Sequence, residues 1–208
     1  MEINEKYISE IVEQVMKNVN VSGSGSKRLH GVFDTMTEAL EAVQKAYKLW
    51  RGYSIEQREK VIAKIREFTL NEAENLARLG VEETGMGRVE DKIIKHQVVA
   101  NKTPGTEDLE TKALTGDDGL TLIEMAPFGI IGSITPSTNP SCTVICNSIC
   151  MLAGGNCVVF NPHPHAKRIS AYAVDLVNRA VLAAGGPENI VVTVANPTME
   201  TSNMMVNH

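Results

Sequence analysis

The loop Thr135-Pro136-Ser137-Thr138-Asn139-Pro140 carries side chains that could stabilise negative charge on a reacting oxygen. It lies inside a run from Met125 to Ala166 that contains no Asp, Glu, Lys or Arg. In such a dry environment hydroxyl and amide donors stabilise a developing oxyanion well. Thr138 and Asn139 are therefore the donors that we single out. A Pro-rich turn satisfied by its own backbone is the competing interpretation.

A second polar loop, Asn161-Pro162-His163-Pro164-His165, is followed by Lys167 and Arg168. No Asp or Glu lies near the two histidines in the sequence, so the spacing does not predict a metal site. The two basic residues begin an expected helix, where charge and helix dipole together attract phosphate. A solvated basic helix start is the alternative.

The four cysteines all lie between Cys142 and Cys157. Three of them recur every four residues and would share one face of a helix: Cys142, Cys146 and Cys150. We interpret all four as small apolar side chains buried against a sheet and kept as reduced thiols in a cytosolic protein. No sequence neighbour could activate any of them as a nucleophile.

The composition is that of a globular protein, with 208 residues, 43% hydrophobic and 22% charged. The net charge of -5 argues against binding to nucleic acid, which requires a basic face. Prolines and asparagines interrupt the charge-free run, so it does not predict a membrane span. We expect the run to be buried or to surround a ligand. The N-terminal residues lack the apolar core of a secretory signal.

Strands and helices alternate in the second half of the chain. Strands are expected over residues 129–135, 157–160 and 190–194, each followed by a helix. This order predicts a parallel sheet whose apolar strands are buried on both faces. Ligands bind at the carboxyl ends of such strands, where both polar loops fall. The glycine fingerprints of ordinary dinucleotide sites and of P-loops are absent.

Four helices precede the sheet. Thr35-x-x-Glu38 and Ser54-x-x-Gln57 are capping boxes that predict the first two helix starts. Asn71 is the expected cap of a third helix that ends near Gly85, and residues 88–99 form a fourth. We expect these helices to cover the later strands. Residues 116–119 predict a turn that leads into a strand over residues 120–125.

Residues 1–20 have apolar side chains at helical spacing and predict an amphipathic helix. A Gly/Ser-rich linker, residues 21–31, separates it from the body, residues 32–208. Such a tether favours a helix that docks on a partner, whereas a helix packed on its own domain is the simpler alternative.

Several motifs together resemble the aldehyde dehydrogenase superfamily. Residues 126–140 resemble its N-terminal signature, and the version with Ser137-Thr138-Asn139-Pro140 is similar to the coenzyme-A-acylating branch. Three further segments resemble that branch, residues 83–92, 160–167 and 195–201. The chain thus resembles the propionaldehyde and acetaldehyde dehydrogenases of bacterial microcompartments.

The resemblance implies a fold and a reaction. The fold is an aldehyde-dehydrogenase-like, three-layer α/β nucleotide-binding domain with a parallel sheet, incomplete here and preceded by the tethered helix. In the reaction, a cysteine attacks an aldehyde, hydride passes to NAD, and coenzyme A releases the acyl group as acyl-CoA. By resemblance, Asn139 stabilises the oxyanion, and the cofactor is bound by Thr135, Pro136, Ser137, Thr138, Asn161 and His163.

The resemblance also implies what this chain lacks and what it binds. None of its four cysteines matches the family nucleophile, which lies downstream, so we expect the 208 residues alone to be inactive. The N-terminal helix corresponds to an encapsulation peptide that binds a shell protein, which places the protein in a cytoplasmic microcompartment, as a homo-oligomer. A non-catalytic shell-docking or nucleotide-binding module is the alternative. The substrate is acetaldehyde or propionaldehyde, and the sequence does not choose between them.

Overall fold

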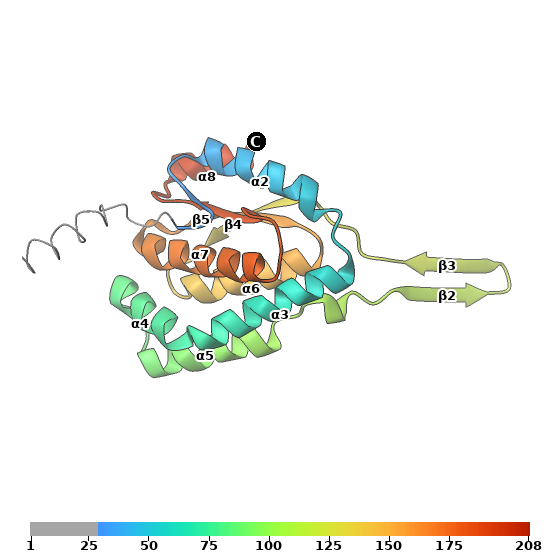
Figure 1. Ribbon diagram of the computed structural model, residues 1–208, viewed down its shortest axis with the longest axis horizontal. Helices are drawn as coiled ribbons and strands as arrows, with labels where there is room; N and C mark the ends of the chain where they lie inside the picture. The colour runs from blue at the N-terminus through green and yellow to red at the C-terminus, as the bar shows by residue number, and fades with distance from the viewer. Residues whose placement is uncertain (1–28) are drawn as a thin grey trace, which may run out of the picture.

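A four-stranded parallel sheet forms the centre of the molecule in the computed structural model, which describes residues 29–208 (Figure 1). The strand order is β1-β6-β5-β4, with bounds β1 (Val32–Phe33), β4 (Ile130–Thr135), β5 (Cys157–Pro162) and β6 (Val191–Val194). All three strand pairs are parallel, as the alternation of strands and helices predicts. The two-residue strand β1 was not expected from the sequence.

Burial differs between the strands. Every residue of β5 and β6 is buried, which fits their uninterrupted apolar sequence. Strand β4 is at the edge of the sheet, and its Ile134 side chain is 64% exposed. The expectation that all strands are buried on both faces is therefore wrong for β4. The charge-free run is likewise only partly buried, since Phe128 is 94% exposed.

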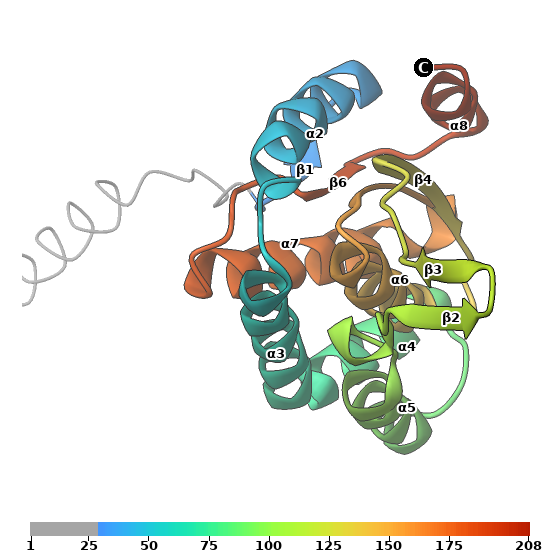
Figure 2. The same ribbon diagram turned by 90° about the vertical axis from the view of Figure 1, so that its right-hand side faces the viewer.

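The helices form layers on both sides of the sheet (Figure 2). Two of them cover one face, α2 (Met36–Trp50) and α8 (Met199–Val206), and two cover the other, α6 (Pro140–Ala153) and α7 (Lys167–Ala183). Three further helices pack on α6 and α7, namely α3 (Ile55–Asn71), α4 (Ala73–Thr84) and α5 (Val89–Lys102). Among the first four helices only α2 packs on the strands, so the expectation that all four do is wrong.

The helix starts follow the sequence at two positions and depart from it at a third. Thr35 and Ser54 both form complete capping boxes at the starts of α2 and α3. Asn71 does not cap a helix, because α3 continues through it and α4 begins after Glu72 without a side-chain cap. Gly85 ends α4 in the left-handed conformation expected of a helix-terminating glycine.

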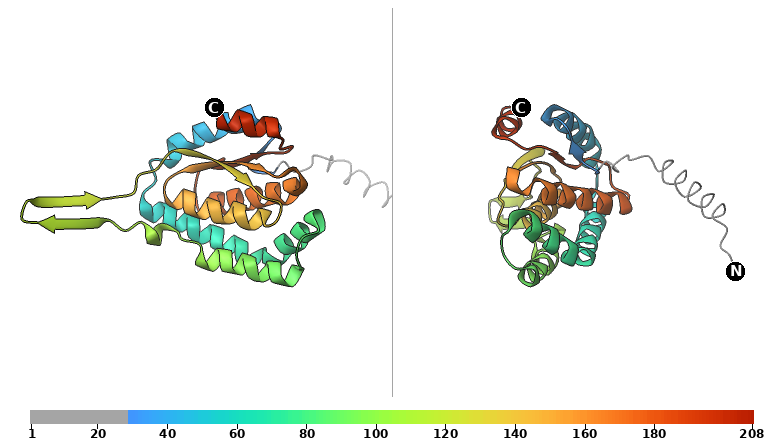
Figure 3. Two further views of the ribbon diagram at one scale, coloured as in Figure 1. Left: turned by 180° about the vertical axis from the view of Figure 1, so that it is seen from behind. Right: turned by 90° about the vertical axis from the view of Figure 1, so that its left-hand side faces the viewer.

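A two-stranded antiparallel hairpin extends away from the body (Figure 3). It consists of β2 (Lys112–Gly116) and β3 (Gly119–Ile123), whose residues are all exposed. The sequence predicted the turn and β3 but not β2. No helix within residues 29–208 is long and apolar enough to cross a membrane.

The expected N-terminal helix, residues 1–20, lies outside the described residues, as does most of the expected linker. Three residues at the linker's end are described, and two of them, His30 and Gly31, are packed on the body. The His30 backbone N–H donates to Asp175 Oδ1 at 2.8 Å, and Gly31 is buried with a φ of 74°. A side chain at Gly31 would approach the Val191 carbonyl oxygen to 2.4 Å, so the body begins no later than His30.

Candidate functional site

The two polar loops lie side by side at the carboxyl ends of β4 and β5, as the sequence predicts. Thr135 pairs with Pro162 in the sheet register, and the Thr135 carbonyl oxygen accepts a hydrogen bond of 3.0 Å from the His163 N–H. A third loop joins them after β6, where Lys167 Nζ donates to Asn196 Oδ1 at 2.9 Å. The three loops together form the edge of the sheet at which parallel α/β folds bind ligands.

Thr135 has a polar atom without a partner at this edge. The side chain is 2% exposed, and its hydroxyl forms no hydrogen bond within the part of the chain that is described. Buried hydroxyls in proteins are normally satisfied. The following residues, Pro136 and Thr138, are exposed, and Ser137 is half-buried. The loop thus offers a hydroxyl that a bound molecule could satisfy.

Asn161 has a different environment from the one expected of a cofactor contact. The side chain is 3% exposed, and its Nδ2 donates to the Thr198 carbonyl oxygen at 3.2 Å and to Ser202 Oγ at 2.6 Å. Its Oδ1 accepts from Thr201 Oγ1 at 2.8 Å. These three hydrogen bonds use both Nδ2 donors and hold the start of α8 against β5.

His163 and His165 are both exposed at the end of β5. Their rings meet edge to face with centroids 5.1 Å apart, and the His165 N–H donates to His163 Nδ1 at 3.2 Å. Across residues 29–208, no three His, Cys, Asp or Glu side chains gather as metal ligands would. His163 therefore faces solvent beside Thr135 with one ring nitrogen already engaged.

The start of α7 does not offer the phosphate site that Lys167 and Arg168 suggested. The Glu83 carboxylate accepts hydrogen bonds from the backbone N–H groups of Arg168 and Ile169, at 2.9 and 2.6 Å. These amides are the ones that would bind an anion at this helix end. Because a carboxylate of the same chain occupies them, the phosphate interpretation is wrong.

Asn139 lies at the start of α6, and its oxygen faces two lysines of α5. Asn139 Oδ1 accepts from Lys92 Nζ at 3.2 Å and from Lys95 Nζ at 3.3 Å. Lys92 also donates to the Thr138 carbonyl oxygen. The Asn139 Nδ2 donates to no described residue and remains available to a ligand. With α6 beginning here, the helix dipole adds to the positive charge of the lysines.

His96 ties the same part of α5 to α6. Its Nδ1 donates to the Lys92 carbonyl oxygen at 2.7 Å, because a carbonyl can only accept. The neutral ring then accepts at Nε2 from the Ser141 hydroxyl at 2.8 Å. The side chain is 1% exposed, and burial lowers its pKa. Sequence reasoning missed Lys92 and His96, although their spacing of four residues places them on one helix face.

An apolar groove of about 520 Å³ runs beside Asn139 between α5 and α6. Exposed Ile94 and Val98 form one wall, and Cys142 and Cys146 form the other. The groove places apolar surface next to an amide donor and a lysine pair. Such a combination suits a small molecule with a short apolar part and one polarisable oxygen.

Three of the four cysteines share one face of α6, but that face borders α5 and does not pack against the sheet, and Cys157 begins β5. Cys142 is buried, Cys146 is half-buried and Cys150 is exposed, so the expectation of four buried packing residues is wrong. Burial raises the pKa of Cys142 to about 11 and also raises that of buried Cys157. A hydrogen bond with Cys150 lowers the pKa of Cys146.

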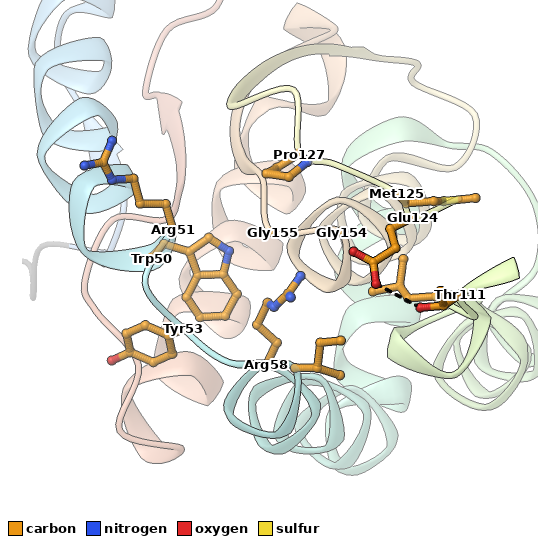
Figure 4. Close-up of a pocket in the computed structure, with 12 residues that line it drawn as sticks. Trp50, Arg51, Tyr53, Arg58, Thr111, Glu124, Met125, Pro127, Gly154 and Gly155 are labelled. Carbon is orange, nitrogen blue, oxygen red and sulfur yellow. Dashed lines mark hydrogen bonds between the residues drawn. The ribbon is translucent and has the colours of Figure 1, made fainter. Parts of the chain in front are cut away.

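A separate pocket of about 270 Å³ lies at the base of the hairpin (Figure 4). Figure 4 shows the Arg58 guanidinium pointing toward Pro127 and Gly155, and its Nη1 donates to the Ala153 carbonyl oxygen at 2.6 Å. This bond caps the end of α6. None of the residues that the sequence singled out lines this pocket, so the site is the strand-end loops and the neighbouring groove.

The fold and the site define an α/β protein with polar loops at the carboxyl ends of parallel strands and an apolar groove beside one of them. These loops lack the glycine-rich phosphate motifs, and one of them has an amide oxygen held by two lysines. The chain belongs to the aldehyde dehydrogenase family: the sequence profile described as "Aldehyde dehydrogenase family" matches residues 30–208.

Similar proteins within this family include curated and structurally characterised members. The acetylating acetaldehyde dehydrogenase EutE of Escherichia coli is 47% identical over 205 residues, which cover 98% of this chain and 44% of EutE. The chain therefore spans less than half the length of this relative.

Two solved structures have the same fold over most of the chain. A propionaldehyde dehydrogenase from the fucose utilisation microcompartment of Clostridium phytofermentans has a TM-score of 0.82 and 59% identity, covering 85% of this chain and 40% of that one. A propionaldehyde dehydrogenase of Rhodopseudomonas palustris with bound CoA and an acylated cysteine has a TM-score of 0.83 and 50% identity. The likeness covers 86% of this chain and 41% of that one.

Proposed function

We propose that this chain is the N-terminal part of a CoA-acylating aldehyde dehydrogenase. The reaction joins a short aldehyde, NAD and coenzyme A to give acyl-CoA, NADH and a proton. The observation that carries the proposal is the Asn139 amide, whose oxygen is held by Lys92 and Lys95 while its Nδ2 remains free beside an apolar groove. The names of the similar proteins support the same reaction.

Asn139 would act on the aldehyde oxygen. When a thiolate attacks the carbonyl carbon, the C=O π bond breaks and its electron pair moves to the oxygen. A free Nδ2–H donor at that oxygen stabilises the charge more than it stabilises the neutral aldehyde. The lysine pair and the start of α6 make the surroundings positive, which favours the same charge. The groove would hold the alkyl part of the substrate.

The strand-end loops fit a nicotinamide cofactor. The unpartnered Thr135 hydroxyl is a donor and acceptor that such a group would satisfy, and it lies where parallel sheets bind nucleotides. Pro136, Ser137, Thr138 and His163 line the same edge. Asn161 would contribute indirectly by holding the start of α8. NAD, when bound, would supply the hydride acceptor, and coenzyme A would be the acyl acceptor.

The nucleophile would come from a part of the enzyme outside these 208 residues, so the chain alone would not turn over. The raised pKa values of Cys142, Cys150 and Cys157 support this, since a thiolate is the attacking form. Cys146 is the cysteine to test, because its pKa is lowered and it lines the groove. Cys146→Ser in an enzyme of full family length should retain turnover, and loss of acyl-CoA formation would identify Cys146 as the nucleophile.

The activity test compares the 208-residue chain with an enzyme of full family length. Each is supplied with acetaldehyde or propionaldehyde, NAD and coenzyme A, and NADH and acyl-CoA are measured. We expect both products from the long enzyme and neither from the short chain. NADH formation by a chain of verified mass would contradict the placement of the nucleophile. The ratio of kcat/KM for the two aldehydes decides the preferred substrate.

We further propose that residues 1–20 bind a microcompartment shell protein through an amphipathic helix, and that the linker after it, which ends before His30, is its tether. The apolar spacing of residues 1–20 and the microcompartment origin of a similar protein support this. Deleting residues 1–19 should abolish co-assembly with shell protein and leave turnover unchanged. Encapsulation that survives the deletion would refute the proposal.

A further inference from the structure

We propose that Lys92 is a positioning residue that orients the Asn139 amide, keeping Oδ1 on the lysine side and Nδ2 free for the reacting oxygen. The inference rests on the proposed function, because the oriented amide matters only if it contacts a substrate. Lys92 lies on α5 and Asn139 at the start of α6, 47 residues apart in the sequence.

The chemistry of the ammonium group selects one orientation of the amide. A lysine ammonium has three donors and no acceptor. Lys92 Nζ and Lys95 Nζ both lie within 3.3 Å of Asn139 Oδ1, and Lys92 also donates to the Thr138 carbonyl oxygen. Rotating the amide by 180° would place its NH2 group against two ammonium groups. The free Nδ2 donor of Asn139 therefore points away from the two lysines.

The burial of Lys92 argues for a role beyond stability. The side chain is 8% exposed, and no carboxylate within residues 29–208 pairs with it. A buried charge without a counter-charge costs folding free energy. Burial accordingly lowers the pKa of Lys92. Its hydrogen bonds instead converge on the strand-end loop and on Asn139.

Two neighbours hold the lysine in place. Gly87 has a φ of 83°, and a Cβ at this position would lie 2.9 Å from Lys92 Cε. His96 fixes the Lys92 carbonyl oxygen and is bonded to Ser141 on α6. The Gly85-Met86-Gly87 segment carries no phosphate-binding fingerprint, and its two glycines have structural roles. Gly85 ends α4, and Gly87 makes room for the lysine side chain.

A double-mutant cycle in an enzyme of full family length tests the coupling of the two residues. Lys92→Met keeps the apolar stem and removes the donors, and Lys102→Met changes an exposed lysine of the same helix. We expect Lys92→Met to lower kcat by about 10- to 100-fold, part of the effect of losing an oxyanion donor. In an Asn139→Ala background it should change kcat by no more than about twofold. Lys102→Met should have no effect in either background.

Two further comparisons separate positioning from folding. Lys92→Arg retains a donor and should restore part of the activity, while the Tm of Lys92→Met should not fall. Gly87→Ala and Gly85→Ala impose the same left-handed strain, but only the first meets Lys92. Gly87→Ala should lower kcat and Gly85→Ala should not. Equal losses in both glycine variants, or a kcat loss that follows a loss of Tm, would overturn the inference.

The failure of this inference is distinct from the failure of the proposed function. If Asn139→Ala lowers kcat and Lys92→Met lowers it equally in both backgrounds, the two residues act independently and only the Lys92 inference fails. If Asn139→Ala leaves kcat unchanged, the amide has no catalytic role, and the proposed function of the site fails together with the inference.

Discussion

Glu83 Oε2 accepts a hydrogen bond of 2.6 Å from the backbone N–H of Ile169. Glu83 lies near the end of α4, and Ile169 lies in the first turn of α7. The contact satisfies an amide that has no partner within its own helix. It also places a negative charge at the positive end of α7. This contact therefore links the outer helix α4 to α7, which packs directly on the sheet.

Replacing Glu83 should weaken the contact between α4 and α7. Glu83→Gln keeps the length of the side chain and removes its charge, so we expect the free energy of unfolding to fall by about 1 kcal/mol. Glu82→Gln is the matched control, because Glu82 is exposed. Urea denaturation of the three proteins measures the effect. An equal change in both variants would show that the contact contributes nothing specific.

Stability should fall in mild acid because of His96. Burial lowers the pKa of the native imidazole, whereas the unfolded residue titrates near its usual value of about 6.5. Below that pH the unfolded chain binds a proton that the native chain does not. The contribution of the neutral His96 side chain to the free energy of unfolding is therefore fully present above about pH 6.5. It declines as the pH falls, by up to about 1.4 kcal/mol per pH unit.

Denaturation between pH 5 and pH 7.5 compares the unmodified chain with two variants. His96→Gln removes the buried imidazole and should flatten the pH dependence, although its stability at neutral pH is expected to be lower because the bond to Ser141 changes. His165→Gln removes an exposed imidazole and should leave the slope intact. An unchanged slope in His96→Gln would show that other groups cause the acid sensitivity.

The hairpin is a proposed surface for self-association. On one of its faces Leu120 and Leu122 are 62% and 61% exposed. An isolated two-stranded hairpin is marginally stable in water, so a partner surface would stabilise it. We expect Leu122→Glu to shift the protein to a smaller oligomer in sedimentation velocity. Thr121→Glu, on the opposite face, should have a weaker effect, and identical sedimentation of all three proteins would exclude this face as the interface.

The sequence predicted the elements whose signals are local. Capping boxes at Thr35 and Ser54 depend on residues three positions apart, and the alternation of apolar strands with helices depends on composition within short windows. The adjacency of Thr135 and His163 followed from the rule that parallel strands end at one edge. The prediction that Asn71 caps a helix was wrong because Asn, although favoured at helix caps, can also lie within a helix when packing extends the helix through it.

The parts that escaped prediction depend on distant contacts. Lys92 meets Asn139, and Glu83 meets Ile169, across separations of 47 and 86 residues, which no local pattern encodes. We expected the apolar faces of α3, α4 and α5 to pack on the sheet. They pack on other helices instead, because an apolar stripe does not specify its partner. For the same reason the cysteine face of α6 was assigned to the sheet, although it borders α5 and the groove.

The central claim is that the Asn139 amide stabilises the reacting aldehyde oxygen. Its most direct test is the rate of acyl-CoA formation by Asn139→Ala, compared with Asn101→Ala, in an enzyme of full family length under saturating NAD and coenzyme A. We predict that Asn139→Ala lowers kcat by about 10² to 10³, and that Asn101→Ala, which changes an exposed asparagine of α5, leaves it near the unmodified value. Equal rates for Asn139→Ala and the unmodified enzyme would contradict the account.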